Sequence, residues 1–158
     1  DLTTAERAEE YFNRTGVDLI VANLGTEHRA SAKDLEYRGD YAKKIKEKIG
    51  TRIVLHGASS VAGDQIEHLI DDGVCKVNIW TALERDSSPA LLESMVKNAS
   101  KIAGTAVVKE LIESGFLGEK CLTGEKASLA YFTTEYRQNI IFNEMKSIIK
   151  GYLKLWYR

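Results

Sequence analysis

The sequence lacks an excess of charge of either sign, a long apolar run and a cysteine-rich pattern. Its 22 Lys and Arg residues nearly balance 23 Asp and Glu residues, which leaves a formal net charge of −1. A chain with this charge balance lacks the excess positive charge that typically attracts a nucleic acid or an anionic membrane surface. No apolar run approaches the roughly 20 residues that a transmembrane helix needs, and we expect no signal peptide. Neither nucleic acid nor membrane is therefore an expected partner.

Cysteine is scarce, since Cys75 and Cys121 are the only two in the chain. Cys75 falls in a predicted strand, where a thiol is usually a small buried hydrophobe. This usage favours a reduced, cytoplasmic protein over a disulfide-stabilised secreted one. The sequence also lacks an initial methionine and enters a helical pattern almost at once, in "TTAERAEEYFNRTG". This opening is typical of a segment from inside a longer protein.

A helix, a glycine and a short apolar strand follow one another three times. The predicted helices cover residues 5–15, 40–49 and 63–72. The predicted strands cover residues 17–24, 51–55 and 74–79. Each helix ends at a glycine, the residue that best adopts the left-handed conformation after a helix. The strands are β-branched and apolar, as parallel strands covered on both faces should be.

This alternation predicts an α/β fold with a parallel sheet. Polar and small residues gather after all three strands, which favours a (β/α)₈ TIM barrel over an open doubly wound sheet. A complete barrel needs about 250 residues, so the chain can hold only the last units. We predict that these units occupy residues 1–87 and that a helical C-terminal extension occupies residues 88–158.

The predicted extension is helical in period and begins at Ser88, with Pro89 in the first turn of its first helix. Its last segment carries apolar residues at helical steps, namely Phe142, Met145, Ile148, Ile149, Leu153 and Trp156. Two interpretations remain open for this stripe. It packs on its own barrel, or it forms an arm that covers a second subunit of a homo-oligomer.

Two histidines follow neighbouring strands at matching positions. His56 follows the strand in "RIVLHGASS", and His28 follows the preceding strand in "LGTEHR". Two imidazoles at the ends of adjacent strands can converge on Zn²⁺ or another divalent transition metal, although a lone histidine there is more often a hydrogen-bonded structural residue. His68 falls inside a predicted helix, and we interpret it as a solvated side chain.

The small residues after His56 suit an anion. In "GASS", residues 57–60, backbone N–H groups can approach a phosphate closely, and the N-terminus of the following predicted helix favours the same charge. The next strand presents Asn78 and Thr81 at its end, and the last loops of a barrel often form a phosphate site. A plain tight turn is the alternative.

Three segments, "GTEH", "VLHGAS" and "GVCKVNIWT", resemble the C-terminal half of the class II, metal-dependent fructose-bisphosphate and tagatose-bisphosphate aldolases. The resemblance implies a barrel that binds zinc through three histidines and dihydroxyacetone phosphate through the metal. It implies reversible aldol cleavage of a ketose bisphosphate to dihydroxyacetone phosphate and an aldehyde. The implied metal ligands here are His28 and His56. The implied phosphate- and substrate-binding residues are Gly25, Gly57, Ser59, Asn78 and Thr81.

The sequence departs from the pattern of these enzymes beside the phosphate site. Arg29 replaces a usual glycine, and Trp80 stands where an aspartate often precedes Thr81. The third histidine and the carboxylates that move protons would lie on earlier strands. We therefore expect the chain to need that N-terminal half of the barrel as a partner and to be inactive alone, and we give Glu27 no catalytic role.

Two rival functions remain open. Lys76 has the same strand parity as Asn78, so it could face the barrel interior and form a Schiff base with the substrate. Alternatively, the protein is a non-catalytic homologue that binds a sugar phosphate or serves in an assembly, which Arg29 and Trp80 leave open.

Overall fold

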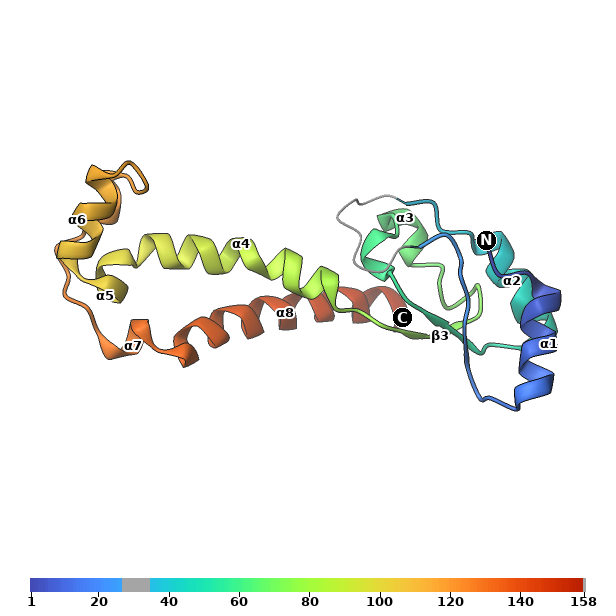
Figure 1. Ribbon diagram of the computed structural model, residues 1–158. Coiled ribbons are helices and arrows are strands. Elements are labelled where there is room, and N and C mark those ends of the chain that lie inside the picture. Colours follow the sequence, from blue (N-terminus) through green and yellow to red (C-terminus); the bar gives the residue numbers. More distant parts are fainter. Residues whose placement is uncertain (27–34, 158) are drawn as a thin grey trace. The chain divides into compact units, whose positions relative to one another are not determined.

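The computed structural model describes residues 1–26 and 35–157. Two compact units divide the chain: the first contains residues 1–82 and 152–158, and the second contains residues 83–151. The first unit carries the repeated helix and strand pattern, and the second is helical (Figure 1). The predicted boundary at residue 87 stays a prediction.

The first helix, α1 (Ala5–Thr15), has the predicted bounds. The Thr4 side chain accepts a hydrogen bond from the amide of Arg7 and caps the N-terminus. Gly16 ends the helix in the left-handed conformation at φ 67°, and its amide donates to the carbonyl of Phe12. A residue with a Cβ is strained at this φ, so the glycine is what lets the chain turn sharply toward the first strand.

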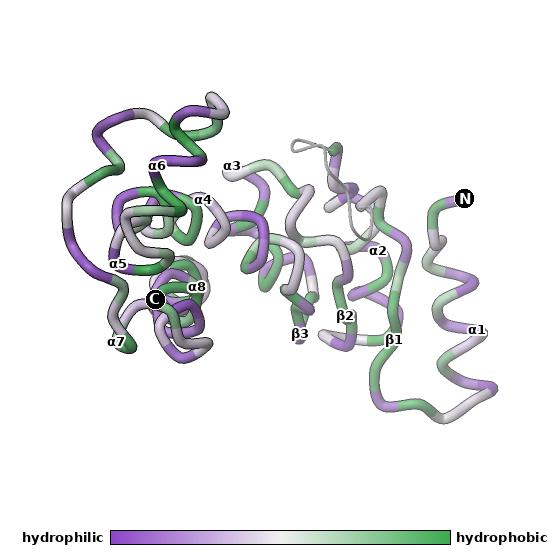
Figure 2. Tube along the Cα trace, turned by 60° about the vertical axis from the view of Figure 1, so that its left-hand side comes forward, coloured by the Kyte–Doolittle hydropathy of each residue, from purple (hydrophilic) through white to green (hydrophobic). Residues whose placement is uncertain are grey.

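The three strands form one parallel sheet in the order β1, β2, β3. They are β1 (Ile20–Val21), β2 (Ile53–Leu55) and β3 (Val74–Val77). All three are shorter than predicted, but all lie inside the predicted ranges. Between β1 and β2 lies α2 (Gly39–Ile49), again close to its predicted bounds. Figure 2 shows the strands side by side and mainly hydrophobic in colour. The parallel arrangement is that of consecutive βα units.

The core of the first unit lies between the sheet and its helices. Ile45 of α2, Ile53 and Leu55 of β2, and Leu69 are completely buried. The end of the last helix also reaches this core: the Trp156 indole N–H donates to the carbonyl of Ile66 at 2.9 Å. At its last turn the C-terminal helix therefore packs on the unit that carries the sheet, as in the first of the two interpretations of the apolar stripe.

The expectation that Cys75 is buried is wrong, because its side chain is exposed. The reason is an irregularity in the register of β2 and β3. Ile53 pairs with Val74, but the next residue, Val54, pairs with Lys76. Cys75 is the extra residue, and an inserted residue leaves the regular alternation of the strand.

The predicted helix over residues 63–72 is wrong beyond its first turn. The helix α3 covers only Gly63–Ile66, and hydrogen-bonded turns continue to Gly73. Asp71 and Asp72 stand where the C-terminus of a longer helix would be. Negative charges there oppose the helix dipole, which accounts for the early end.

The prediction that Pro89 opens a helix is also wrong. The helix α4 covers Thr81–Lys97, and Pro89 lies inside it. The missing N–H of Pro89 removes the hydrogen bond to the carbonyl of Arg85, a change that costs about 3 kcal/mol in a helix interior. The neighbouring hydroxyls of Ser87 and Ser88 donate to the carbonyl of Glu84 and strengthen the turn before the proline.

The other helices of the second unit are α5 (Ala99–Ala103), α6 (Thr105–Glu113), α7 (Leu129–Phe132) and α8 (Thr134–Trp156), whose last residues from Tyr152 on belong to the first unit. A small core of this unit contains Ala99 of α5, Val108 of α6 and Cys121. Phe142 of α8 is 61% exposed, so this part of the predicted stripe is not covered by the described residues. None of the described helices has the length and apolar character to cross a membrane.

Candidate functional site

A cavity of about 360 Å³ opens at the carboxyl ends of β2 and β3. We call it the strand-end cavity. It is lined by His56, Gly57, Ala58, Ser59, Val77, Asn78, Ile79, Trp80 and Thr81. The structure thus brings five of the seven predicted site residues to one cavity, all from the first unit. Gly25 does not line it, and His28 lies outside the described residues.

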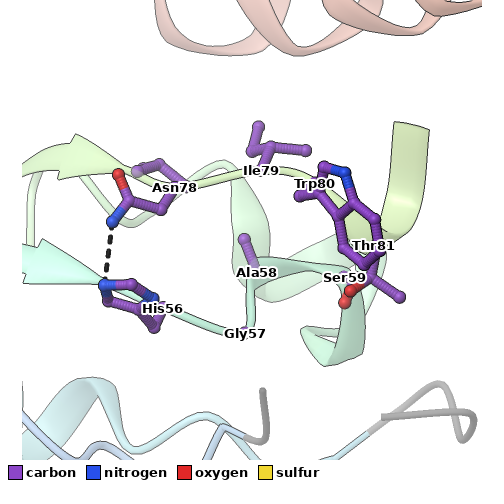
Figure 3. Close-up of a pocket in the computed structure, with 9 residues that line it drawn as sticks. His56, Gly57, Ala58, Ser59, Asn78, Ile79, Trp80 and Thr81 are labelled. Carbon is purple, nitrogen blue, oxygen red and sulfur yellow. Dashed lines mark hydrogen bonds between the residues drawn. The ribbon is translucent and has the colours of Figure 1, made fainter. Parts of the chain in front are cut away.

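His56 and Asn78 form one end of the strand-end cavity (Figure 3). The ladder between the two strands continues past their ends, because the Asn78 amide donates to the carbonyl of Leu55 at 3.0 Å. The side chains consequently lie together, with the Asn78 Nδ2 atom 2.8 Å from the His56 Nε2 atom.

This contact controls which nitrogen of the His56 ring carries a proton. When the Asn78 NH₂ group donates to Nε2, the proton of a neutral ring is on Nδ1. When the amide is turned so that its oxygen accepts from Nε2–H, Nδ1 presents a lone pair instead. That second arrangement is the one found around metal-bound histidines, where a neighbouring group fixes the tautomer. The structure has Nδ2 of Asn78 on Nε2, so His56 would suit a metal through Nδ1 only with the Asn78 amide turned.

The described residues do not form a metal site by themselves. They contain no group of three His, Cys, Asp or Glu side chains that could hold an ion together. Thr26 was not among the predicted residues, yet its hydroxyl donates to the carbonyl of His56 at 2.7 Å. This bond ties the end of the segment after β1 to His56. In the sequence, the only sign of this contact was that Thr26 belongs to the motif "GTEH".

The predicted anion-binding turn follows His56 directly. Gly57 is left-handed at φ 74°, and Ala58–Ser60 form the 3₁₀ turn η1. The Ser60 hydroxyl is buried and donates to the carbonyl of Gly57 at 2.7 Å, so it stabilises the turn and does not point toward a ligand. The first N–H groups of such a turn have no acceptor within it and can serve an anion. The helix that follows the turn, α3, has only four residues, so its dipole favours an anion less than the longer helix predicted from the sequence would.

Trp80 and Thr81 lie at the other end of the strand-end cavity, with Ser59 (Figure 3). The Trp80 side chain is 60% exposed although it lines the cavity. The two ends therefore differ: one has an imidazole and an amide, and the other has hydroxyl groups, a turn and an indole.

Lys76 and His68 lie away from this cavity lining. Lys76 pairs with Val54 and is exposed, on the same face of the sheet as Asn78 two residues later. His68 is exposed, and its Nε2 atom is 3.9 Å from a carboxylate oxygen of Glu67. The prediction of a solvated His68 is confirmed, although the helix ends before it.

A parallel βα array with its polar residues at the strand ends defines a part of an α/β barrel protein. The chain belongs to the class II fructose-bisphosphate aldolase family, which matches residues 1–147. Over 96 residues it is 34% identical to the D-tagatose-1,6-bisphosphate aldolase subunit GatY of Klebsiella oxytoca, a match that covers 61% of this chain and 34% of the relative. The predicted resemblance is therefore confirmed.

Two solved structures share the fold. The YdjI aldolase of Escherichia coli K12 superposes with a TM-score of 0.63 at 19% identity, over 99% of this chain and 46% of that one. The fructose-bisphosphate aldolase of Campylobacter jejuni gives a TM-score of 0.71 at 18% identity, over 98% of this chain and 45% of that one. The predicted TIM-barrel fold is confirmed, and the chain spans less than half the length of these relatives.

Proposed function

We propose that this chain carries the phosphate-binding end and part of the metal site of a class II ketose-bisphosphate aldolase. The observation that supports the proposal most is the strand-end cavity, which joins His56 and Asn78 to the Gly57–Ser60 turn. The reaction would be the reversible aldol cleavage of fructose 1,6-bisphosphate or a related ketose bisphosphate to dihydroxyacetone phosphate and an aldehyde.

Each described residue has a distinct part in this proposal. His56, together with His28, would hold Zn²⁺ or another divalent transition metal. A metal bound there would act as a Lewis acid on the ketone. Asn78, which contacts the His56 ring, would orient that ring and contact the dihydroxyacetone moiety. The turn at Gly57 and Ser59, together with Thr81, would bind the phosphate and hold the substrate in register with His56.

The proton-transfer groups and the third histidine would come from the N-terminal half of the barrel. The matched relatives are about twice as long as this chain. Activity therefore belongs to the completed barrel, and we expect none from the 158 residues alone.

The test uses the whole polypeptide that carries this sequence, with His56→Ala as the variant and His68→Ala as its matched control. We expect His56→Ala to lose stoichiometric zinc and aldol cleavage and to keep its circular dichroism spectrum. His68→Ala should keep the metal and the activity, because its side chain is exposed. Full zinc content in folded His56→Ala would contradict the proposal.

A Schiff-base mechanism through Lys76 is the second candidate, because Lys76 lies on the same face of β3 as Asn78. Borohydride reduction in the presence of dihydroxyacetone phosphate separates the two. Covalent labelling of Lys76 would support the amine mechanism. Chelator-sensitive cleavage without labelling would support the metal mechanism, and a protein that binds metal but cleaves no ketose bisphosphate would be a non-catalytic homologue.

A further inference from the structure

Trp80 is an exposed indole in the lining of the strand-end cavity. Its side chain is 60% exposed, whereas a tryptophan in a folded protein is usually largely buried. It lies at the same end of the cavity as Ser59 and Thr81, away from the contact between His56 and Asn78 (Figure 3). A large apolar ring therefore stands next to the turn that suits an anion.

The backbone on both sides fixes the position of Trp80. Before it, the Asn78 amide is hydrogen-bonded to the carbonyl of Leu55, and Ile79 packs against the core of the first unit. After it, Thr81 begins α4, and Ala82 is completely buried. The backbone at Trp80 is therefore held on both sides, and its side chain lines the cavity while it stays largely exposed.

The chemistry of an indole limits what it can contact there. The face of an aromatic ring carries negative charge density, so the face does not bind the oxygens of an anion, and the Nε1–H at the ring edge is the one indole group that can donate to them. It packs well against C–H groups, and it removes water from a neighbouring hydrogen-bonded site. This end of the cavity is therefore suited to an anionic group that is attached to a short carbon chain, with the anion on the turn and the carbons on the ring.

We propose that Trp80 is a specificity-determining residue that packs against the carbon chain next to the substrate phosphate. Trp80 thereby makes the site select a phosphate monoester of a short ketose over free inorganic phosphate. The inference rests on the proposed function, because it takes the turn after His56 as the phosphate site.

The test compares two probes, dihydroxyacetone phosphate and inorganic phosphate, by titration calorimetry on the whole polypeptide loaded with zinc. Trp80→Ala should weaken the binding of dihydroxyacetone phosphate about tenfold, the upper size of one aromatic contact. It should leave the binding of inorganic phosphate unchanged. Trp80→Phe keeps a ring and should retain most of the affinity. Phe116→Ala, a change at an aromatic residue that is 79% exposed and does not line the cavity, is the control and should change neither probe.

Three results would overturn the inference. If Trp80→Ala binds dihydroxyacetone phosphate as tightly as the wild type does, Trp80 makes no contact with the carbon chain. Equal weakening of both probes would mean that Trp80 only supports the turn. A wild-type protein that binds neither probe would refute the proposed function itself, and the inference with it.

Fluorescence gives a second readout, because the chain has two tryptophans. Trp156 donates its indole N–H to the carbonyl of Ile66 and is not part of the cavity lining. In a whole polypeptide in which Trp156 and any tryptophan outside this sequence are replaced by Phe, Trp80 is the only indole. Dihydroxyacetone phosphate should then change the emission of Trp80, and inorganic phosphate at the same occupancy should change it less. An equal response to both probes would count against the contact with the carbon chain.

Discussion

Tyr37→Phe should stabilise the chain. Tyr37 is 4% exposed, and its hydroxyl makes no hydrogen bond of good geometry with the described residues, although the Asp72 carboxylate lies close to it. The Asp72 carboxylate nearby is also buried, and its Oδ1 atom lacks a hydrogen bond, with the Lys43 Nζ atom 3.5 Å away. Removal of the hydroxyl keeps the ring in the core and takes away the cost of burying an unpaired polar group.

The magnitude follows from that cost. An unpaired buried hydroxyl destabilises a folded protein by about 1–3 kcal/mol. Asp72 attracts the hydroxyl proton even without hydrogen-bond geometry, so we expect the lower end of this range. A gain of about 1 kcal/mol in the free energy of unfolding raises Tm by roughly 2–4 °C for a chain of this size.

Urea denaturation measures the effect, with Tyr136→Phe as the matched control. The Tyr136 hydroxyl accepts a hydrogen bond from the Asn98 side chain at 3.1 Å and lies 3.1 Å from the Ser94 hydroxyl. The same chemical change there should destabilise the chain by about 1 kcal/mol. If Tyr37→Phe destabilises the chain as much as Tyr136→Phe does, the Tyr37 hydroxyl has a partner in solution and the reasoning is refuted.

The same residue gives a pH dependence with a definite sign. Burial, and then the nearby Asp72 carboxylate, raise the pKa of Tyr37 far above its ordinary value of about 10. Above pH 10 or so, the unfolded chain releases the Tyr37 proton and the folded chain keeps it, so the stability of the wild type falls as pH rises. The advantage of Tyr37→Phe should therefore grow between about pH 9 and 11, and a constant difference would contradict the assignment.

Two further substitutions test the packing. Gly73→Ala should destabilise the chain by about 2 kcal/mol or more, because Gly73 has φ +100° and an added Cβ would lie 2.7 Å from the Lys46 Cβ atom. Gly63→Ala, where an added Cβ meets nothing within 4 Å, is the control and should be neutral or stabilising in urea denaturation. Ser100→Ala should cost about 1–3 kcal/mol, since the buried Ser100 hydroxyl donates to the carbonyl of Cys121 at 3.0 Å. An unchanged thermal midpoint would contradict that value.

The parts of the fold that were predictable depend on local patterns. The helix over Ala5–Thr15 has an apolar stripe, a threonine cap and a terminal glycine, and all three signals lie within the segment itself. The parallel sheet follows from the alternation of such helices with apolar strands. The predictions failed where one local signal opposed another. Pro89 is a good first-turn residue, yet the helix that begins at Thr81 continues through it.

Features that depend on tertiary contacts had no local signal. Tyr37 stands between the charged residues Glu36 and Arg38, and nothing near it in the sequence indicates that its buried hydroxyl lies close to Asp72, 35 residues later. Trp80 was recognised only as a departure from the motif of the related aldolases. Its place in the cavity lining could not be predicted without knowing where the turn after His56 lies in the fold.

The contact between His56 and Asn78 shows why strand ends were predictable and side-chain contacts were not. Both residues follow apolar strands, so the sequence places them at one edge of the sheet. Their pairing depends on the extra residue, Cys75, between the partners of Ile53 and Val54. In a regular register, Val54 would pair with Cys75, and Val77 instead of Asn78 would stand beside His56. The amide that fixes the imidazole therefore reaches it through an irregularity in the sheet, which no local periodicity of β3 reveals.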